Sequence, residues 1–309
     1  MRKTRKQRLA AKLPTTLKRK PELVQLKNLD YNPDIFTTLN TCTVVDEFFS
    51  TKHGIPKACN FILIGDPGVG KSTVALDMLC NVQQEGSRAL FISAEMNEID
   101  MYGYMERFPK FGNVDILFLA DYTDENPKLV IESVLQKGYD IVLLDSFSEI
   151  CEEMQEVCFM SSKGAEKCLI DLACKHNKAG NDKGLYTTFL MIQQMTKGGK
   201  FVGSNKLKHN TTGMLEIRFD GTSNNAPRYM EFSKNRRGDV QKRLYFTLDK
   251  TEDVNYLEDK WHAEEENRGR MENEIEALRL EAEAFDALLD AETEDAPQTD
   301  APVEEVAAT

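Results

Sequence analysis

Residues 65–73 read Gly65-Asp66-Pro67-Gly68-Val69-Gly70-Lys71-Ser72-Thr73, which matches the pattern G-x-x-x-x-G-K-[ST] at every fixed position. The apolar residues 61–64 before it predict a buried strand, and residues 74–79 after it are typical of the start of a helix. A strand, a Gly-rich turn and a helix N-terminus together make a phosphate site, because backbone N–H groups converge there. The stretch predicts a P-loop that binds a nucleoside triphosphate; a chance Gly-rich turn is the alternative.

The residue types within this loop fit such a site. Gly65, Gly68 and Gly70 let the backbone curl around phosphate oxygens where a Cβ would interfere. Lys71 is expected to reach the β- and γ-phosphates, and the Ser72 hydroxyl to take one Mg²⁺ position. We therefore expect residues 65–73 to bind ATP, with Mg²⁺ as a second cofactor.

Three further polar residues follow apolar runs and predict hydrolysis of the bound nucleotide. Asp145 ends the run 141–145, where a carboxylate beside a P-loop can hold Mg²⁺. Glu95 follows the run 89–93 and is expected to polarise the attacking water, although a surface acid is the alternative. Gln194 follows the run 187–193, where a neutral amide can sense the γ-phosphate. Together they predict a Mg²⁺-dependent ATPase.

Strand and helix patterns alternate along the chain, which predicts an α/β fold with a mainly parallel central sheet and helices on its faces. We expect parallel strands at residues 61–64, 89–93, 114–119, 141–145 and 187–193, helices at 41–49, 127–136 and 165–176, and antiparallel strands at 213–219, 228–233 and 243–248. Residues 54–56 are expected to form a turn before the P-loop strand.

Charge divides the chain of 309 residues into four expected segments. They are a basic N-terminal arm and linker (1–33), an ATPase domain (34–250), an acidic helical extension (251–292) and a disordered acidic tail (293–309). Residues 1–20 carry nine Lys/Arg and no acid, whereas residues 252–309 carry twenty Asp/Glu and four Lys/Arg. The arm can bind nucleic acid or remain a solvated tail, and the acidic tail can serve a protein partner.

Apolar residues in the acidic extension repeat at a spacing of 4-3-4-3-4, which places them on one stripe of a helix. They are Met271, Ile275, Leu278, Ala282, Phe285 and Leu289. We favour a helix that docks on its own domain or makes an oligomer contact; an extended coiled coil is the alternative.

Cysteine use and hydropathy are typical of an intracellular protein. None of the seven cysteines forms a C-x-x-C pair, which favours reduced thiols over disulfides or zinc ligands. The basic N-terminus has no apolar signal region, and no apolar run approaches the length of a membrane span. We expect a cytoplasmic location, in the host cytoplasm if a phage encodes the chain, and no membrane partner.

Several stretches resemble the RecA-like ATPases, most closely the bacterial RadA/Sms DNA repair and recombination family. Residues 91–95 (Phe-Ile-Ser-Ala-Glu) resemble its catalytic-glutamate strand, and residues 144–146 (Leu-Asp-Ser) its Walker B strand. Residues 234–238 (Lys-Asn-Arg-Arg-Gly) resemble its K-N-R-F-G signature. The lead-in at 37–56 and the segment 195–199 add to a likeness that covers roughly residues 36–248.

This resemblance implies a RecA-like core and a homo-oligomer, either a hexameric ring or a filament. It implies that Lys234 and Arg236 act on the γ-phosphate of a neighbouring subunit; a pair of exposed basic residues on a hairpin is the alternative. It also favours DNA, single-stranded or branched, as the partner of the basic arm and of the 197–208 loop, which carries Lys197, Lys200, Lys206 and Lys208. An ordinary solvated connection is the alternative for the loop. The chain departs from the family because it lacks the four-cysteine zinc module and the protease-like domain and has Arg237 where the signature has Phe.

Two functions therefore remain open from the sequence. The first is a DNA-dependent ATPase, a motor or a recombination mediator, in recombination, repair or replication. The second is a regulatory or assembly ATPase of the RecA/KaiC-like class that recruits protein partners. Stimulation of hydrolysis by DNA distinguishes them.

Overall fold

The computed structural model describes residues 21, 23–194, 207, 210–221, 226–248 and 253–294, with side chains described up to residue 285. The expected basic segment 1–20, nearly all of the 197–208 loop and residues 295–309 of the expected disordered tail lie outside the described residues.

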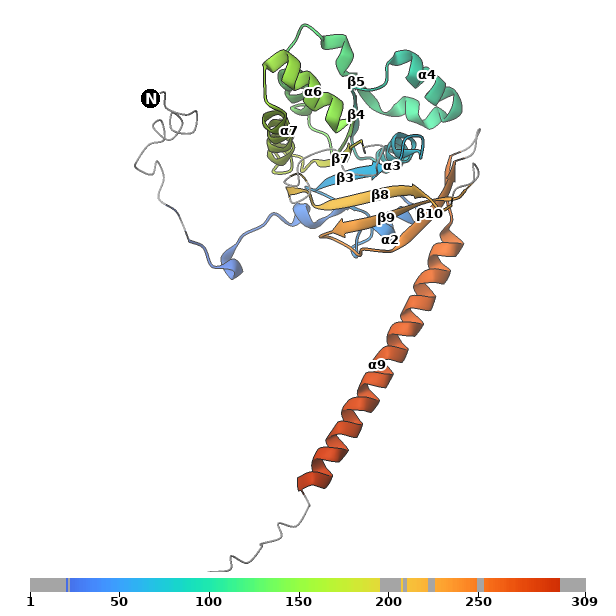
Figure 1. Ribbon diagram of the computed structural model, residues 1–309. Coiled ribbons are helices and arrows are strands. Elements are labelled where there is room, and N and C mark those ends of the chain that lie inside the picture. The colour runs from blue at the N-terminus through green and yellow to red at the C-terminus, as the bar shows by residue number, and fades with distance from the viewer. Residues whose placement is uncertain are drawn as a thin grey trace, which may run out of the picture.

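A nine-stranded sheet forms the centre of the described part, in the order β11-β10-β9-β8-β3-β7-β6-β4-β5 (Figure 1). The strands from β8 to β5 in this order run parallel, and β8, β9, β10 and β11 pair antiparallel. The predicted mixed α/β fold with a mainly parallel sheet is confirmed. The strands are β3 (Asn60–Gly65), β4 (Ala89–Ser93), β5 (Asp115–Phe118), β6 (Ile141–Asp145), β7 (Thr188–Ile192), β8 (Gly213–Phe219), β9 (Arg228–Asn235), β10 (Arg243–Leu248) and β11 (Val254–Tyr256).

Alternating residues of the central strands send side chains into two separate cores. Phe61 and Leu63 of β3 enter the core that includes α3 (Lys71–Gln84), whereas Ile62 and Ile64 enter the core beneath α5, α6 and α7. All four are buried, as expected for a strand covered on both faces. The covering helices are α5 (Pro127–Leu135), α6 (Phe147–Cys158) and α7 (Ser162–His176), and α4 (Glu98–Arg107) follows β4.

The segment before the P-loop strand is more irregular than the sequence predicted. Its helix α2 covers only Val45–Phe49, and the expected turn at 54–56 contains β2 (Ile55–Pro56), which pairs with β1 (Thr38–Leu39). The remaining short elements are 3-10 turns, namely η1 (Leu26–Asn28), η2 (Pro33–Phe36), η3 (Pro109–Asn113) and η4 (Leu119–Tyr122).

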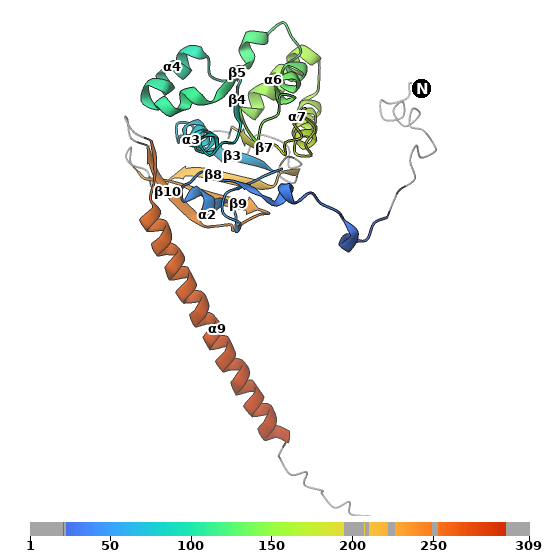
Figure 2. The same ribbon diagram turned by 180° about the vertical axis from the view of Figure 1, so that it is seen from behind.

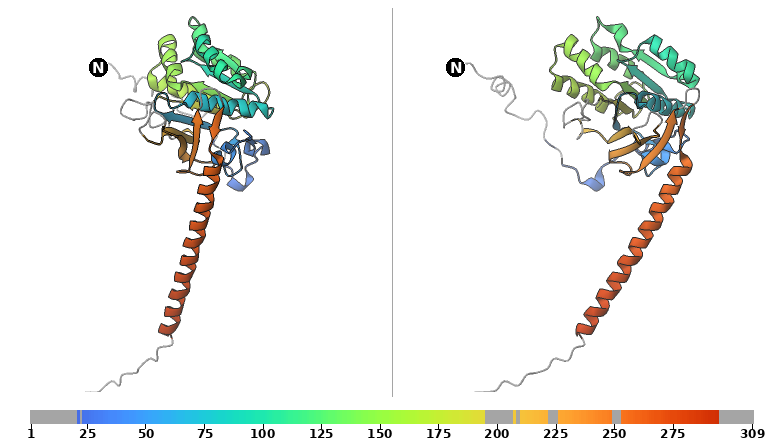
Figure 3. Two further views of the ribbon diagram at one scale, coloured as in Figure 1. Left: turned by 90° about the vertical axis from the view of Figure 1, so that its right-hand side faces the viewer. Right: turned by 45° about the vertical axis from the view of Figure 1, so that its right-hand side comes forward.

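The last helix, α9 (Glu258–Glu294), leaves the sheet directly after β11 and projects away from the rest of the structure (Figures 1 and 2). Two further views show the same projection from the side (Figure 3). Its apolar stripe is exposed at Met271, Ile275, Leu278 and Phe285. Docking of this stripe on its own domain, one of the two favoured options, is wrong, because these side chains are exposed. The oligomer contact stays a prediction.

Within the described ranges, no helix combines the length and apolar character that a membrane crossing requires. The seven cysteines are all unpaired; Cys59, Cys80 and Cys151 are buried and Cys42 is exposed.

Candidate nucleotide-binding site

The predicted phosphate loop connects the end of β3 to the start of α3. Gly68 and Gly70 have φ angles of 76° and 98°, a left-handed conformation that glycine adopts without steric cost. At Gly65 a Cβ would lie 2.2 Å from the carbonyl oxygen of Ile217 on β8, so only glycine fits there without movement. The loop thus has the strand, turn and helix context that a phosphate site requires.

The loop side chains contact the end of β6 and the loop itself. Ser72 Oγ donates a hydrogen bond of 2.5 Å to Asp145 Oδ2, which joins the start of α3 to the end of β6. Lys71 Nζ donates to the carbonyl oxygens of Gly65 and Asp66 at 2.9 and 3.0 Å. Lys71, Ser72 and Asp145 therefore converge at one place, as the sequence predicted.

Burial shifts the pKa values of two charged groups in this cluster. Burial raises the pKa of Asp145 to about 6; the Ser72 hydrogen bond acts in the opposite direction, and the charge of Glu95 adds to the rise. Burial lowers the pKa of Lys71, while nearby carboxylates, Asp145 first among them, act in the opposite direction. The charges of Lys71, Asp145 and Glu95 thus influence one another, although they come from the P-loop, the end of β6 and the residues after β4.

Backbone and hydroxyl contacts fix the position of Glu95. Ser93 Oγ donates to the carbonyl oxygen of Met96 at 2.8 Å and accepts from its N–H at 3.0 Å, which closes a tight turn. The N–H of Ala94 donates to the carbonyl oxygen of Asp145 at 2.7 Å. Glu95 is thereby presented beside Asp145, with its side chain exposed.

The two glutamines after β7 have different environments. Gln194 Nε2 donates to Glu149 Oε1 of α6 at 3.2 Å. Gln193 is buried, and its Oε1 has no hydrogen-bond partner among the described residues. Only Gln194, the residue that the sequence predicted, lines the cavity beside the P-loop.

That cavity has a volume of about 510 Å³ and collects most of the predicted site. Its lining includes these predicted residues: Gly65, Pro67, Gly68, Gly70, Lys71, Ser72, Thr73, Glu95, Asp145 and Gln194. Asp66 and Val69 do not line it; Val69 is fully buried and Asp66 is exposed. The P-loop and the carboxyl ends of β4, β6 and β7 thus face one concave space.

Sequence reasoning missed the other wall of the cavity. Arg228 at the start of β9, Leu248 at the end of β10, and Tyr104 and Arg107 of α4 also line it. Burial, and then the charge of Arg107, lower the pKa of Arg228, whose guanidinium lies 5.0 Å from the centre of the Phe219 ring. These residues enter the site through the order of the strands, which no local motif records.

Lys234 and Arg236 lie elsewhere. Lys234 Nζ donates to the carbonyl oxygen of Thr211 at 2.5 Å. Arg236 lines a different groove of about 340 Å³, together with Phe36, Lys52 and Arg237. Within one chain these two cations are therefore not brought to the P-loop cavity.

Comparison with solved structures decides the fold. The flagellar accessory protein FlaH from Methanocaldococcus jannaschii aligns over 69% of this chain and 95% of its own, with a TM-score of 0.52 and 12% identity. A KaiC-like protein from Pyrococcus horikoshii aligns over 72% of this chain and 99% of its own, with a TM-score of 0.54 and 17% identity. The chain therefore shares the fold of these two proteins, a RecA-like fold.

Curated sequences agree with the RecA-like assignment at low identity. The DNA repair protein RadA of Mycobacterium tuberculosis is 27% identical over 187 residues, which are 60% of this chain and 36% of that protein. Protein RecA of Lactococcus lactis is 31% identical over 157 residues, 49% of this chain and 39% of that protein. The chain thus spans little more than a third of the length of these relatives. No protein-family model matches the chain.

Proposed function

We propose that this chain is a Mg²⁺-dependent ATPase that binds DNA and couples ATP hydrolysis to work on single-stranded or branched DNA. The hydrogen bond between Ser72 and Asp145, beside Lys71 and Glu95 in one cavity, carries the hydrolytic part of the proposal. A P-loop hydroxyl held against a buried strand-end carboxylate is the arrangement on which P-loop ATPases rely for their metal.

The residues present fit Mg²⁺. Ser72 and Asp145 offer a hydroxyl and a carboxylate oxygen, the hard oxygen ligands that Mg²⁺ prefers. A buried carboxylate whose pKa is raised to about 6 gains a compensating charge when a cation binds. Ser72 and Asp145 would hold the metal, which when bound neutralises charge on the phosphate oxygens.

The other cavity residues divide the remaining tasks. Lys71 would release its loop carbonyls and bind the β- and γ-phosphates through Nζ. Glu95 would accept a proton from the attacking water, a contribution of typically ~10²–10⁴-fold in rate. Gln194 would exchange its contact with Glu149 for the γ-phosphate and so report the state of the nucleotide.

Lys234 and Arg236 would act in a homo-oligomer, a hexameric ring or a filament, on the nucleotide of the adjacent copy. A cation supplied in trans stabilises charge on the transferred phosphoryl group and is worth ~10³–10⁵ in rate. An Arg236→Ala protein and a Glu95→Gln protein, each inactive alone, should regain partial ATPase activity when mixed. If mixing restores nothing although the two variants co-assemble, the trans role is wrong.

The DNA part of the proposal draws on the names of the relatives, DNA repair protein RadA and RecA. It also draws on the lysines of the 197–208 loop and the basic residues 1–20, since spaced cations bind phosphate backbones. The deciding experiment compares ATPase rates with and without single-stranded DNA. An increase of several-fold supports the proposal; an unchanged rate together with no DNA binding would contradict it.

A regulatory or assembly ATPase is the second candidate. It is favoured by the likeness to the FlaH and KaiC-like structures, and by the acidic helix α9, whose extension could serve a protein partner. In this case ATP would be hydrolysed at a rate that DNA does not change.

A further inference from the structure

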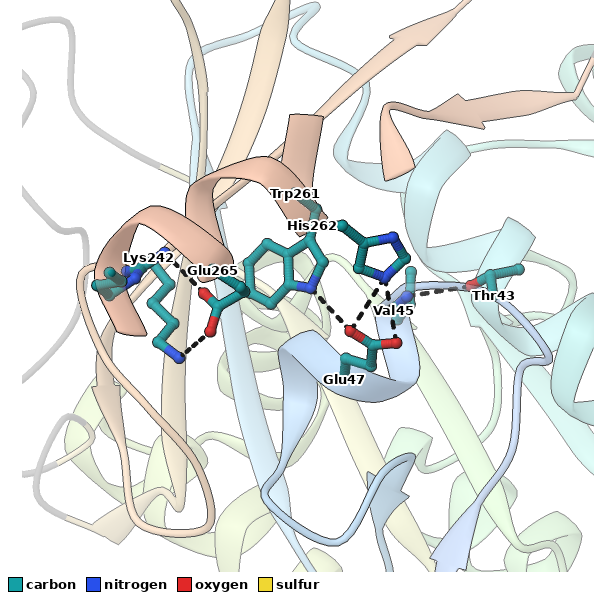
Figure 4. Close-up of polar contacts among 8 residues, drawn as sticks. Thr43, Val45, Glu47, Lys242, Trp261, His262 and Glu265 are labelled. Atoms are coloured by element: carbon teal, nitrogen blue, oxygen red, sulfur yellow. Dashed lines mark hydrogen bonds and ion pairs between the residues drawn. The ribbon is translucent and has the colours of Figure 1, made fainter. Parts of the chain in front are cut away.

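The base of α9 is fixed to the core by a set of specific contacts (Figure 4). Trp261 is only 3% exposed, its ring lies 5.8 Å from that of Phe48, and its Nε1 donates to Glu47 at 3.0 Å. Lys242 Nζ lies 2.7 Å from Glu265 Oε2. These contacts determine the direction in which α9 leaves the core.

Beyond this base lies the apolar stripe that the sequence predicted, here called the seam, formed by residues 271, 275, 278, 282, 285 and 289. Leu278 is 60% exposed, and Met271, Ile275 and Phe285 are exposed to a similar degree. The seam extends for roughly 27 Å at the usual helical rise. An exposed face of this length and regularity costs free energy unless another surface covers it.

The residue types on the seam favour a coiled coil of two helices. The 4-3 spacing is the a/d repeat of a left-handed coiled coil, with Ile275 and Ala282 at a and Met271, Leu278 and Phe285 at d. A β-branched residue at a combined with leucine at d, as at Ile275 and Leu278, favours parallel dimers. We propose that the seam of α9 pairs in parallel with the α9 of a second copy of this chain.

Charges beside the seam favour the parallel orientation. In a parallel pair Glu274 at g meets the partner's Arg279 at e, and symmetry forms this contact twice. Arg279 now contacts Glu283 at 3.0 Å, an exposed pair that is weak and readily exchanged. An antiparallel pair that keeps the whole seam in contact would instead bring Arg279 close to the partner's Arg279, and Glu281 close to the partner's Glu281.

One parallel contact opposes the pairing, because Glu281 meets the partner's Asp286. The seam is also shorter than three heptads. We therefore expect a moderate, concentration-dependent dimer. The pairing does not depend on nucleotide, so its success or failure is separate from that of the proposed ATPase function.

The test uses the full chain without nucleotide and two matched leucines. Leu280 is 57% exposed, almost the same as Leu278, but lies at position f on the opposite side of the helix. Leu278→Glu should raise the dimer dissociation constant on the order of a hundredfold or more, since it places a charge at two buried seam positions. Leu280→Glu should leave the constant unchanged. Sedimentation equilibrium measures both.

Cross-linking tests the same helix contact and stays informative even if the ATPase domains associate with each other independently of α9. Leu278→Cys should form a disulfide between copies under mild oxidation, whereas Leu280→Cys should not exceed the wild type, which carries the same native cysteines. Both substituted positions are exposed in the single chain, so circular dichroism should show an intact fold. Equal cross-linking of the two variants, or a monomeric wild type at all concentrations, would overturn the proposal.

Discussion

Gly65→Ala tests how closely the P-loop is fitted to the sheet. The new Cβ would lie 2.2 Å from the carbonyl oxygen of Ile217, and real Cβ atoms essentially never approach another atom closer than 3.0 Å. The difference, 3.0 − 2.2, requires a movement of about 0.8 Å between β3 and β8. The collision is with backbone, so no side-chain rotation can relieve it.

This movement should be transmitted to the chemistry through the loop itself, because Gly65 ends β3 and begins the segment that carries Lys71 and Ser72. A misplacement of about 1 Å in a catalytic site costs about 10²-fold in rate. We expect kcat/KM for ATP to fall by about that factor, and the free energy of unfolding to fall by about 1–3 kcal/mol through overpacking. ATPase kinetics and urea denaturation measure the two effects.

Gly103→Ala is the matched control, because a Cβ at Gly103 in the middle of α4 would meet no atom within 4 Å. Alanine there should be neutral or stabilise the chain by up to about 1 kcal/mol. The reasoning fails if Gly65→Ala retains the wild-type urea midpoint. Lower stability with undiminished ATPase activity would instead refute only the transmission of the movement through the P-loop.

Three other predictions concern the site, the arm and the core. Lys71→Ala should abolish tight ATP binding, whereas Glu95→Gln should bind ATP and hydrolyse it ~10²–10⁴ times more slowly; wild-type turnover by Glu95→Gln would make Glu98 the next candidate base. Deletion of residues 1–20 should make the association constant for single-stranded DNA less sensitive to salt. The negative slope of its logarithm against log salt should become shallower by about 0.7 for each phosphate that the arm neutralises. An unchanged slope would assign the arm to another partner. Burial lowers the pKa of His176 in the folded chain, so the unfolded chain takes up the proton at a higher pH than the folded chain. The free energy of unfolding should therefore fall as the pH drops below about 6.5, the ordinary pKa of histidine. His176→Leu should flatten this dependence in urea titrations between pH 5 and 8; an equally steep dependence in the variant would exclude His176 as its cause.

The sequence predicted the P-loop side of the cavity well because each part of it is local. A run of apolar residues fixes a strand, and the polar residue after it must lie at the carboxyl edge of the sheet. Local patterns place Asp145 and Glu95 in this way. The hydrogen bond from Ser72 to Asp145 depends in addition on strand order, with β6 two strands from β3. Helix α6 was missed although a local signal existed, since the Ser146 side chain caps the N–H of Glu149 in a Ser-x-x-Glu pattern.

The opposite wall could not be predicted, because it depends on strand order and on pairing between distant segments. Arg228 reaches the cavity since β9 pairs antiparallel with β8, which brings its first residue to the same edge as the end of β3. The position of α9 is a similar case. Periodicity predicted its helix and stripe, but the direction of the helix depends on contacts between distant segments, those of Trp261 and of Glu265 with Lys242.

The direction of β9 also constrains how Lys234 and Arg236 can act. The strand begins at the cavity with Arg228 and ends where Asn235 pairs with Gly213, at the opposite edge of the sheet. At about 3.4 Å per residue, Lys234 lies roughly 20 Å along the strand from Arg228, farther than a lysine side chain can reach. These cations therefore do not reach the P-loop cavity of their own chain, and in the proposed mechanism they would contact the nucleotide of another copy. A role for Lys234 and Arg236 in hydrolysis therefore requires that copies of the chain assemble. Mixing the Arg236→Ala and Glu95→Gln proteins tests the assembly and the role in one measurement.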